Sequence, residues 1–378
     1  NRITAVSTQI DVKTAKAALF PSLSFSTGHQ VVNRPYQETS SRVSGSEIIS
    51  SNSKTSYNGN YGLNASWTLY NGNKRLKTIQ QEKLNNQMAE LDVATSENNI
   101  QESIAQVYIQ ILYAAESVKV NENTLQVSIA QRDRGQELLN AGSIAKSDLA
   151  QLEAQVSTDR YQLVTAQATL EDYKLQLKQL LELDGENEMN IYLPALSDEN
   201  VLAPLPTKRD VYISALSLRP EIEASKLNVE ASELGINIAK SSYFPTISLS
   251  AGIGTNHTSG SDFTFGEQVK NGWNNSIGLS VSVPIFNNRQ TKSAVQKAKL
   301  QYETSMLSLL DEQKALYKTI ESLWLDANSA QQRYAAANEK LKSTQISYEL
   351  ISEQFNLGMK NTVELLTEKN NLLQAQQE

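Results

Sequence analysis

The sequence contains no cysteine, so neither a disulfide framework nor a thiolate metal site can form. This absence fits an oxidising compartment such as the bacterial periplasm. Only 39% of the 378 residues are hydrophobic, and 7% are aromatic. Such a composition argues against several thick globular cores. It favours thin layers in which each helix buries one apolar stripe.

Long apolar runs and basic clusters are also missing. No segment approaches the roughly 20 consecutive apolar residues that a membrane-spanning helix requires. Residues 1–16 are polar with a helical pattern and do not resemble a signal peptide, so we expect any secretion signal to have been removed. The net charge of −7 is dispersed, which argues against a phosphate-binding surface for nucleic acid.

No catalytic or nucleotide-binding constellation is present. The only histidines, His29 and His257, do not fall in a metal-ligand spacing, so we expect no metal site and no cofactor. The segment from Gly252 to Gly254 lacks the third glycine of a dinucleotide-binding loop. The many carboxylates follow helix faces, where a solvated surface is the ordinary interpretation. The sequence therefore does not predict an enzyme.

What the sequence does contain is an internal repeat, with halves of about 1–200 and 201–378. Three segments recur in order, namely 15–28 as 239–252, 61–71 as 277–287, and 139–142 as 355–358. The interval from Tyr70 to Gly142 has the same length as the interval from Phe286 to Gly358. Two rigid elements have therefore kept their length, and the difference between the halves lies in a polar loop.

Each half begins with strands. Apolar and small polar residues alternate in four segments, which predicts two β-hairpins over 20–70 and 244–286. Tyr57, Tyr61, Leu63, Trp67 and Leu69 share one face in this pattern, and Asn and Ser residues the other. Periodicity alone fits a half-buried soluble sheet as well as membrane-spanning strands. The long Ser-rich loops 32–56 and 255–272 favour membrane strands, because such barrels carry long polar loops on one side.

Beyond the strands the apolar period changes to a heptad, which predicts long coiled-coil helices. The helical regions are expected at 1–19, 71–183, 221–243 and 287–378, with a mixed equatorial segment at 184–220. In the returning helix of the first half, the apolar seam from Leu149 to Leu180 is broken only by Asp159. Asn71 and Asn287 are predicted N-caps, and Gly142 and Gly358 stand where the helices must end and turn back.

These residues together resemble the TolC-like outer-membrane efflux protein family. The features that carry the resemblance are the duplicated Phe-Pro pairs and glycine turns, and Arg219-Pro220-Glu221 before the helix that leads to the second hairpin. The resemblance implies a mainly α-helical chain with transmembrane β-strands. Three such chains would build a twelve-stranded outer-membrane β-barrel, continuous with a periplasmic α-helical coiled-coil barrel. It also implies longer segments at both ends than this chain has.

The resemblance also implies a function and partners. The chain would be an exit duct in the outer membrane of a Gram-negative bacterium, coupled to an inner-membrane transporter through a periplasmic adaptor protein. Independent physical reasoning favours a trimer, because open sheet edges are not tolerated in lipid and a chain with only four strands cannot close. The alternative is a soluble trimeric coiled-coil scaffold, in which the hairpins mediate assembly and bury their apolar faces against helices.

Site residues follow from the same resemblance. Asp148 and Glu364 occupy equivalent places after the two glycine turns and are candidates for a cation-selective entrance gate, although acids there also complement a helix dipole. Their mutual repulsion in a trimer should raise some of their pKa values. Lys360 is a candidate to hold a closed state by pairing with an acid. The remaining candidates are the adaptor-docking turns, Ala141, Gly142, Ser143, Leu357, Gly358 and Met359, and the interface aromatics, Trp67 and Trp273.

Overall fold

The computed structural model forms two compact units, and each contains parts of both halves of the sequence. Unit 1 comprises residues 1–93 and 219–313, and unit 2 comprises residues 94–218 and 314–378. The residues described are 1–36, 40–44, 47–51, 54–183, 191–192, 194, 201–259, 261 and 263–378.

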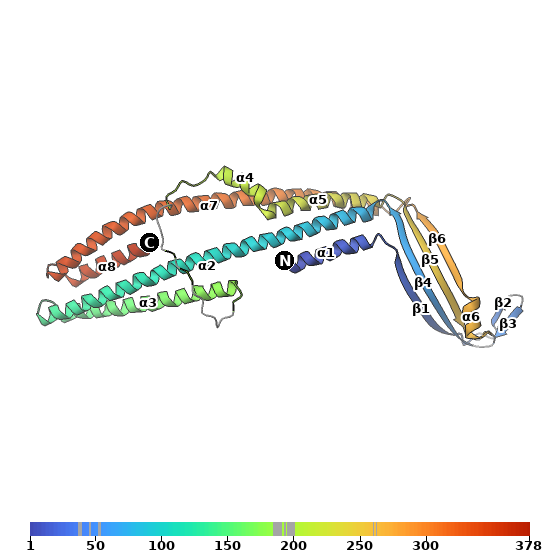
Figure 1. The fold of residues 1–378 in the computed structure, drawn as a ribbon, viewed down its shortest axis with the longest axis horizontal. Coiled ribbons are helices and arrows are strands. Elements are labelled where there is room, and N and C mark those ends of the chain that lie inside the picture. Colours follow the sequence, from blue (N-terminus) through green and yellow to red (C-terminus); the bar gives the residue numbers. More distant parts are fainter. Residues whose placement is uncertain are drawn as a thin grey trace. The chain divides into compact units, whose positions relative to one another are not determined.

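Unit 1 contains an antiparallel four-stranded sheet of order β1-β4-β5-β6 (Figure 1). The strands are β1 (Ser22–Asn33), β4 (Thr55–Asn71), β5 (Thr246–Thr258) and β6 (Asn274–Ser282). The central pairing of β4 with β5 joins the first hairpin to the second. The two predicted hairpins therefore form one continuous sheet, with β1 and β6 at its edges.

The register keeps apolar residues on one face, as the alternation predicted. Phe25 pairs with Leu63, and Trp67 pairs with Leu249. The regular pairing is interrupted at the end of β4, beside Leu69. A register shift between Thr68 and Tyr70 makes Tyr70 the partner of Ile247. A bulge of this kind inserts an extra residue in one strand, which period-2 reasoning cannot anticipate.

Both predicted loops contain short elements that the sequence pattern did not indicate. The first includes the small hairpin β2 (Ser40–Ser44) and β3 (Glu47–Ser51). The second contains the helix α6 (Phe265–Asn271), which begins with a capping box in which Thr264 and Glu267 exchange hydrogen bonds. The described residues of these loops exclude 37–39, 45–46, 52–53, 260 and 262.

The long helices are α2 (Lys74–Asn140) and α7 (Gln290–Asn356), and each has 67 residues. Their equal length confirms the equal intervals in the repeat. The predicted N-caps are wrong, because the helices begin three residues after Asn71 and Asn287. Gly72 and Asn73 have positive φ before α2, as do Asn288 and Arg289 before α7, and this left-handed backbone delays the helix start.

In unit 1, α1 (Arg2–Ala17) and α5 (Pro220–Ser241) follow the first part of α2. The Thr8 hydroxyl donates to Asn86 at 3.1 Å, and the Gln81 amide donates to the Ala231 carbonyl at 3.0 Å. Pro220 occupies the first turn of α5, where its missing N–H costs nothing, and Ile222 is fully buried. Polar contacts thus join α1 to α2, and α5 adds buried residues such as Ile222.

In unit 2, the ends of α2 and α7 turn back into α3 (Lys146–Leu180) and α8 (Thr362–Gln377). The buried apolar side chains come from all four helices and include Ile111, Leu152, Val156, Phe355 and Leu365. Gly135 permits a close approach between α2 and α3, because a Cβ there would lie 2.5 Å from Leu152 Cδ1. Thin packing of this kind is what the low hydrophobic content predicted.

The predicted mixed segment is described only in part. Residues 184–190, 193 and 195–200 lie outside the described residues, and α4 (Lys208–Leu218) follows them. Lys208 forms an ion pair with Glu321 at 3.0 Å and lies 4.9 Å from the centre of the Trp324 ring. The Trp324 indole donates to the Pro206 carbonyl at 3.0 Å, so this segment is fixed to α7. Among the residues described, no helix has the length and apolar character to cross a membrane.

Candidate functional site at the helical turns

The first turn ends α2 with a left-handed glycine. Gly142 has φ of +74°, and a Cβ there would meet nothing within 4 Å, so the turn faces open space. Its N–H donates to the Leu139 carbonyl at 2.9 Å, and the Ser143 N–H donates to the Leu138 carbonyl at 2.8 Å. These two bonds form a Schellman motif, which satisfies the last carbonyls of the helix.

The second turn repeats this geometry. Gly358 also has φ of +74°, its N–H donates to Phe355, and the Met359 N–H donates to Gln354. Leu357 and Met359 expose 70% and 72% of their surface. The structure therefore confirms both glycine helix ends, and it leaves two apolar side chains uncovered at one of them.

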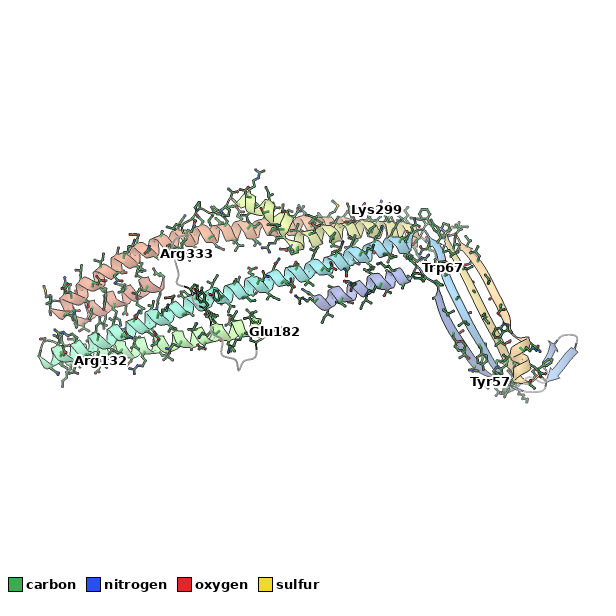
Figure 2. All side chains as sticks on the ribbon, viewed as in Figure 1. Tyr57, Trp67, Arg132, Glu182, Lys299 and Arg333 are labelled. Carbon is green, nitrogen blue, oxygen red and sulfur yellow. The ribbon has the colours of Figure 1, made fainter. Side chains whose placement is uncertain are left out.

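The two turns lie close together in unit 2. The Arg134 guanidinium donates to the Asn356 carbonyl at 3.5 Å, and the Gln131 amide donates to the Tyr348 hydroxyl at 2.8 Å. These contacts join α2 to α7 just before both turns. Arg132, labelled in Figure 2, marks the same end of α2. The equal helix lengths thus bring both glycine turns to one place.

The helices that follow the turns begin differently. Asp148 is the third residue of α3, and its carboxylate accepts from the Ala145 N–H at 3.1 Å. Ala145 has no side-chain acceptor to return this bond. Glu364 is the third residue of α8, and its carboxylate accepts from the Asn361 N–H at 3.2 Å. Asn361 returns the bond by accepting from the Glu364 N–H at 2.9 Å. Only the second turn has a complete capping box.

A lysine adds to the second turn. Lys360 Nζ donates to Glu364 at 2.6 Å, and both side chains are partly exposed. The pKa of Glu364 lies below its ordinary value. The main cause is the hydrogen bond that Lys360 donates to the carboxylate, and the second is the hydrogen bond from the Asn361 backbone N–H. Within one chain, this lowering of the pKa is opposite to the increase predicted from repulsion between the turn acids of a trimer. The acid that Lys360 pairs with lies in its own turn, so the pair stabilises local structure.

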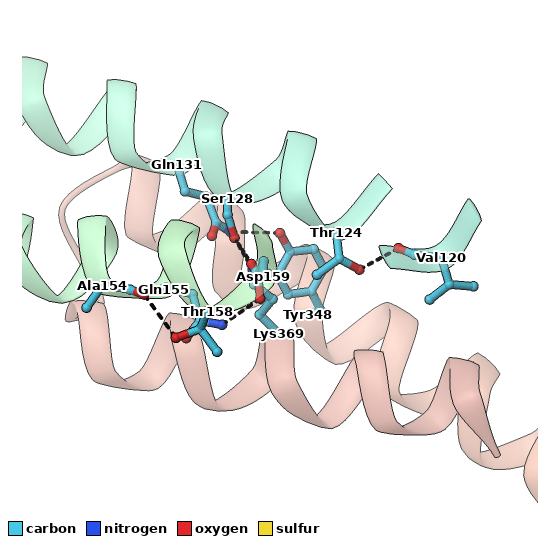
Figure 3. Close-up of polar contacts among 10 residues, drawn as sticks. All are labelled: Val120, Thr124, Ser128, Gln131, Ala154, Gln155, Thr158, Asp159, Tyr348 and Lys369. Atoms are coloured by element: carbon cyan, nitrogen blue, oxygen red, sulfur yellow. Dashed lines mark hydrogen bonds and ion pairs between the residues drawn. The ribbon is translucent and has the colours of Figure 1, made fainter. Parts of the chain in front are cut away.

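Beneath the turns, three helices share a buried ionic cluster made of Ser128, Asp159 and Lys369 (Figure 3). These residues come from α2, α3 and α8 and expose only 2%, 1% and 3% of their surface. Lys369 Nζ donates to Asp159 Oδ2 and to Ser128 Oγ, and the Ser128 hydroxyl donates to the same carboxylate oxygen. The Gln155 amide donates to the other oxygen at 2.9 Å, so both oxygens of the acid are satisfied.

The cluster has an energetic cost and a structural consequence. Removing two charges from water costs several kcal/mol per ion, which the ion pair and its hydrogen bonds must offset. Burial lowers the pKa of Lys369, and the bond to Asp159 opposes that shift only in part. Burial also raises the pKa of the nearby Tyr348 hydroxyl. The cluster ties α8 to α2 and α3, and hence the second half of the sequence to the first.

Only part of this cluster is evident from the sequence. Asp159 was visible as the one break in the apolar seam of α3. Lys369 carried no such signal, because the short α8 also contains many polar residues. A polar residue in a heptad seam requires a buried partner, so the break at Asp159 indicates a basic residue in another helix.

The two candidate aromatics lie in unit 1, near opposite ends of the sheet. The Trp67 indole donates to the Leu19 carbonyl at 2.7 Å, at the helix end of the sheet in Figure 2. Trp273 precedes β6 beside α6 and exposes 57% of its surface. The described residues contain no group of three or more His, Asp or Glu side chains that could hold a metal ion.

Comparison with known proteins supplies further findings. The model of the outer membrane efflux protein family matches residues 4–182 and 211–378. Outer membrane efflux protein BepC of Brucella suis biovar 1 (strain 1330) is 24% identical over 282 residues, which are 74% of this chain and 59% of BepC. Outer membrane protein TolC of Escherichia coli (strain K12) is 24% identical over 283 residues, which are 72% of this chain and 56% of TolC. The chain thus spans less than two thirds of the length of these relatives.

Two solved structures have a similar fold. A crystal structure of CusC, described as forming a transmembrane channel, has a TM-score of 0.80 at 19% identity and covers 100% of this chain and 82% of that chain. The outer membrane protein VceC from Vibrio cholerae has a TM-score of 0.79 at 16% identity, with 99% and 85% covered. These similarities show that the mainly helical fold with a four-stranded sheet is shared.

Proposed function

The chain belongs to the outer membrane efflux protein family, and on this premise we propose that it is one protomer of a homotrimeric exit duct in the outer membrane of a Gram-negative bacterium. Its sheet would contribute four strands to a twelve-stranded barrel. Its helices would form the wall of a periplasmic α-helical barrel. The duct would take its cargo from an inner-membrane transporter through a periplasmic adaptor protein.

The observation that carries this proposal is the sheet of unit 1, which exposes its apolar face. Leu23, Phe25, Ile277, Leu279 and Val281 are all exposed, and Leu279 exposes 64% of its surface. A patch of this extent requires a cover of lipid or protein. Among the described residues, neither β1 nor β6 pairs with a further strand along its outer edge. Closure with copies of the same chain would satisfy both edges in lipid.

The opposite face of the sheet supports a water-filled interior. The neighbours in this layer are small and polar, as in the rows Ser24–Asn64 and Ser248–Ser280. An eight-stranded barrel has an interior that side chains just fill, whereas twelve strands leave a wider one. Ser, Asn and Gly side chains are too short to close it. The face therefore fits the lining of an aqueous pore.

The scaffold alternative required the apolar strand faces to bury against helices. In the structure these faces are exposed, and the helix with the main contact to the described part of the sheet is the short α6. A soluble scaffold is therefore not favoured.

Within the proposed duct we assign roles to the turns. Asp148 and Glu364 would contribute six carboxylates to the periplasmic mouth of a trimer, where they would favour cations. Lys360 would moderate this potential through its pair with Glu364. The exposed residues of the two turns, Ala141, Gly142, Ser143, Leu357, Gly358 and Met359, would receive the adaptor, because they combine a glycine backbone with uncovered apolar side chains.

The test combines assembly with conductance. The protein purified in mild detergent should have the mass of a trimer and open channels in planar bilayers. Leu279→Arg should destabilise the assembly by roughly 2–4 kcal/mol at mid-membrane, whereas Ser280→Arg on the neighbouring face should cost much less. A monodisperse monomer without conductance, or equal tolerance of both substitutions, would contradict the proposal.

A further inference from the structure

The two histidines of the chain lie side by side in unit 1, although they are far apart in sequence. His29 on β1 pairs with Gly59 on β4, and Gly59 pairs with His257 on β5. The three residues thus form one row on the face of the sheet that also carries Tyr61 and Leu63, at the end where α6 contacts β5. Tyr57, on the same face of β4, completes the group at the α6 end of the sheet (Figure 2).

Gly59 leaves a space into which both imidazole rings turn. A Cβ built on Gly59 would lie 2.7 Å from His257 Nδ1 and 3.0 Å from His29 Nδ1. Two ring nitrogens therefore converge on one point above the backbone of β4. The ring centres are 6.4 Å apart, which is compatible with two ligands of one ion after small side-chain rotations.

The hydrogen bonds around His29 are compatible with a tautomer that can bind a metal ion. His29 Nε2 lies 3.2 Å from the Thr27 hydroxyl oxygen, and Nδ1 lies 2.7 Å from the Tyr57 hydroxyl. If Nε2 carries the proton and donates to Thr27, Nδ1 presents a lone pair toward Tyr57. A hydrogen bond of this kind on the remote nitrogen orients metal-binding histidines in general.

His257 contributes an unsatisfied nitrogen. Its Nδ1 atom is buried and has no hydrogen-bond partner among the residues that the structure describes. The ring itself is held in place, stacked on Tyr61 at 5.9 Å and in edge contact with Phe265 at 4.9 Å. A buried, unpaired polar atom is costly, so a fixed ring with such an atom facing a second imidazole indicates a missing ligand.

We propose that His29 and His257, with the Tyr57 hydroxyl beside them, form a binding site for a late first-row divalent metal ion, with Cu²⁺ preferred. Two imidazole nitrogens and a phenol oxygen suit such ions, and their affinity for nitrogen and oxygen ligands is highest for Cu²⁺. The bound ion would connect β1 to β5 across β4. It would thereby clamp the hairpin of one repeat half to the hairpin of the other.

The direct test uses the intact protein, purified without a histidine tag, and Cu²⁺ alone. Electron paramagnetic resonance should show one saturable Cu²⁺ per chain with two imidazole nitrogen ligands. This measurement on the wild type decides the proposal without any variant. A saturated spectrum with fewer than two imidazole nitrogens, or no saturable binding, would overturn it.

Variants then locate the site. His29→Gln and His257→Gln should each weaken Cu²⁺ binding at least tenfold, since the loss of supporting residues alone costs about 10–100-fold at metal sites. Gly59→Ala should also weaken it, because its methyl group occupies the point between the rings. Gly62→Ala is the matched control, since its Cβ would meet no atom closer than 3.4 Å. Unchanged affinity in the double histidine variant would overturn the proposal.

Discussion

The turns and the buried cluster of unit 2 both contain a lysine–carboxylate pair, but in opposite surroundings. Lys360 and Glu364 are partly exposed, whereas Lys369 and Asp159 are almost completely buried. Exposed pairs contribute little to stability because water and salt screen them. A buried pair costs much to break, since one charge would remain unpaired. A lysine–carboxylate pair can therefore remain accessible to solvent and ions at the turns, whereas a similar pair beneath them holds helices together.

Removing the buried lysine should have the largest effect. Lys369→Met leaves the Asp159 carboxylate buried without its counter-ion and should lower the free energy of unfolding by roughly 3–5 kcal/mol. Denaturant unfolding of the assembled protein measures this change. Lys360→Met is the matched control, because it removes an exposed lysine from the same region. Equal effects of the two substitutions would contradict the contrast between the pairs.

Replacing both buried partners should restore most of the free energy of unfolding that Lys369→Met removes. Lys369→Met with Asp159→Leu removes both charges, and apolar replacement of buried ion pairs is often neutral or stabilising. A double-mutant cycle isolates the coupling. If the double variant is as unstable as the two single losses combined, Asp159 and Lys369 do not act as a pair.

The buried lysine also predicts an alkaline pH dependence. Its pKa is lowered in the folded state, so between that value and about 10.4 the unfolded chain binds more protons. The contribution of Lys369 to stability should therefore increase as pH rises through this window. The difference between the unfolding midpoint of the wild type and that of the Lys369→Met, Asp159→Leu variant should therefore shift in favour of the wild type as pH rises toward about 10.4. If the difference between the two midpoints shifts in favour of the variant instead, the ion pair with Asp159 raises the pKa of Lys369.

Changes to the helix caps after the two turns should have smaller effects on the free energy of unfolding. Asn361→Ala removes the side-chain cap of α8 and should cost about 0.5–2 kcal/mol. Ala145→Asn supplies the missing cap of α3 and should stabilise by a similar or smaller amount. Thermal unfolding measures both changes. If Ala145→Asn destabilises, the backbone at the first turn does not accept a capping side chain.

The smallest expected effect is the loss of stability from the exposed pair, Lys360 and Glu364, as pH falls. The lowered pKa of Glu364 means that its contribution is complete above the unfolded value near 4.3 and is lost as pH falls through the folded value. Glu364→Gln should therefore reduce the acid sensitivity of the unfolding midpoint slightly. An acid profile identical to that of the wild type would indicate that Lys360 does not support Glu364 in solution.

The sequence predicted features that depend on local periodicity. Alternation located four strands, and heptads located two helices of equal length ended by Gly142 and Gly358. Contacts between distant segments were not predictable in this way. Asp159 stood out, but its partner Lys369 lies on another helix, and His29 and His257 meet only because β1 and β5 flank β4. The bulge near Leu69 and the helix α6 depend on local backbone details that no periodic pattern encodes.

We propose that the turn acids act on ions, whereas the buried cluster holds the helices together. The most direct test is the reversal potential of single channels in a salt gradient. We predict that Asp148→Asn with Glu364→Gln reduces cation selectivity. Glu171→Gln with Glu339→Gln, which removes the same charge from exposed helix positions, should leave selectivity nearly unchanged. An unchanged reversal potential in the first variant, or an equal shift in both, would contradict the account.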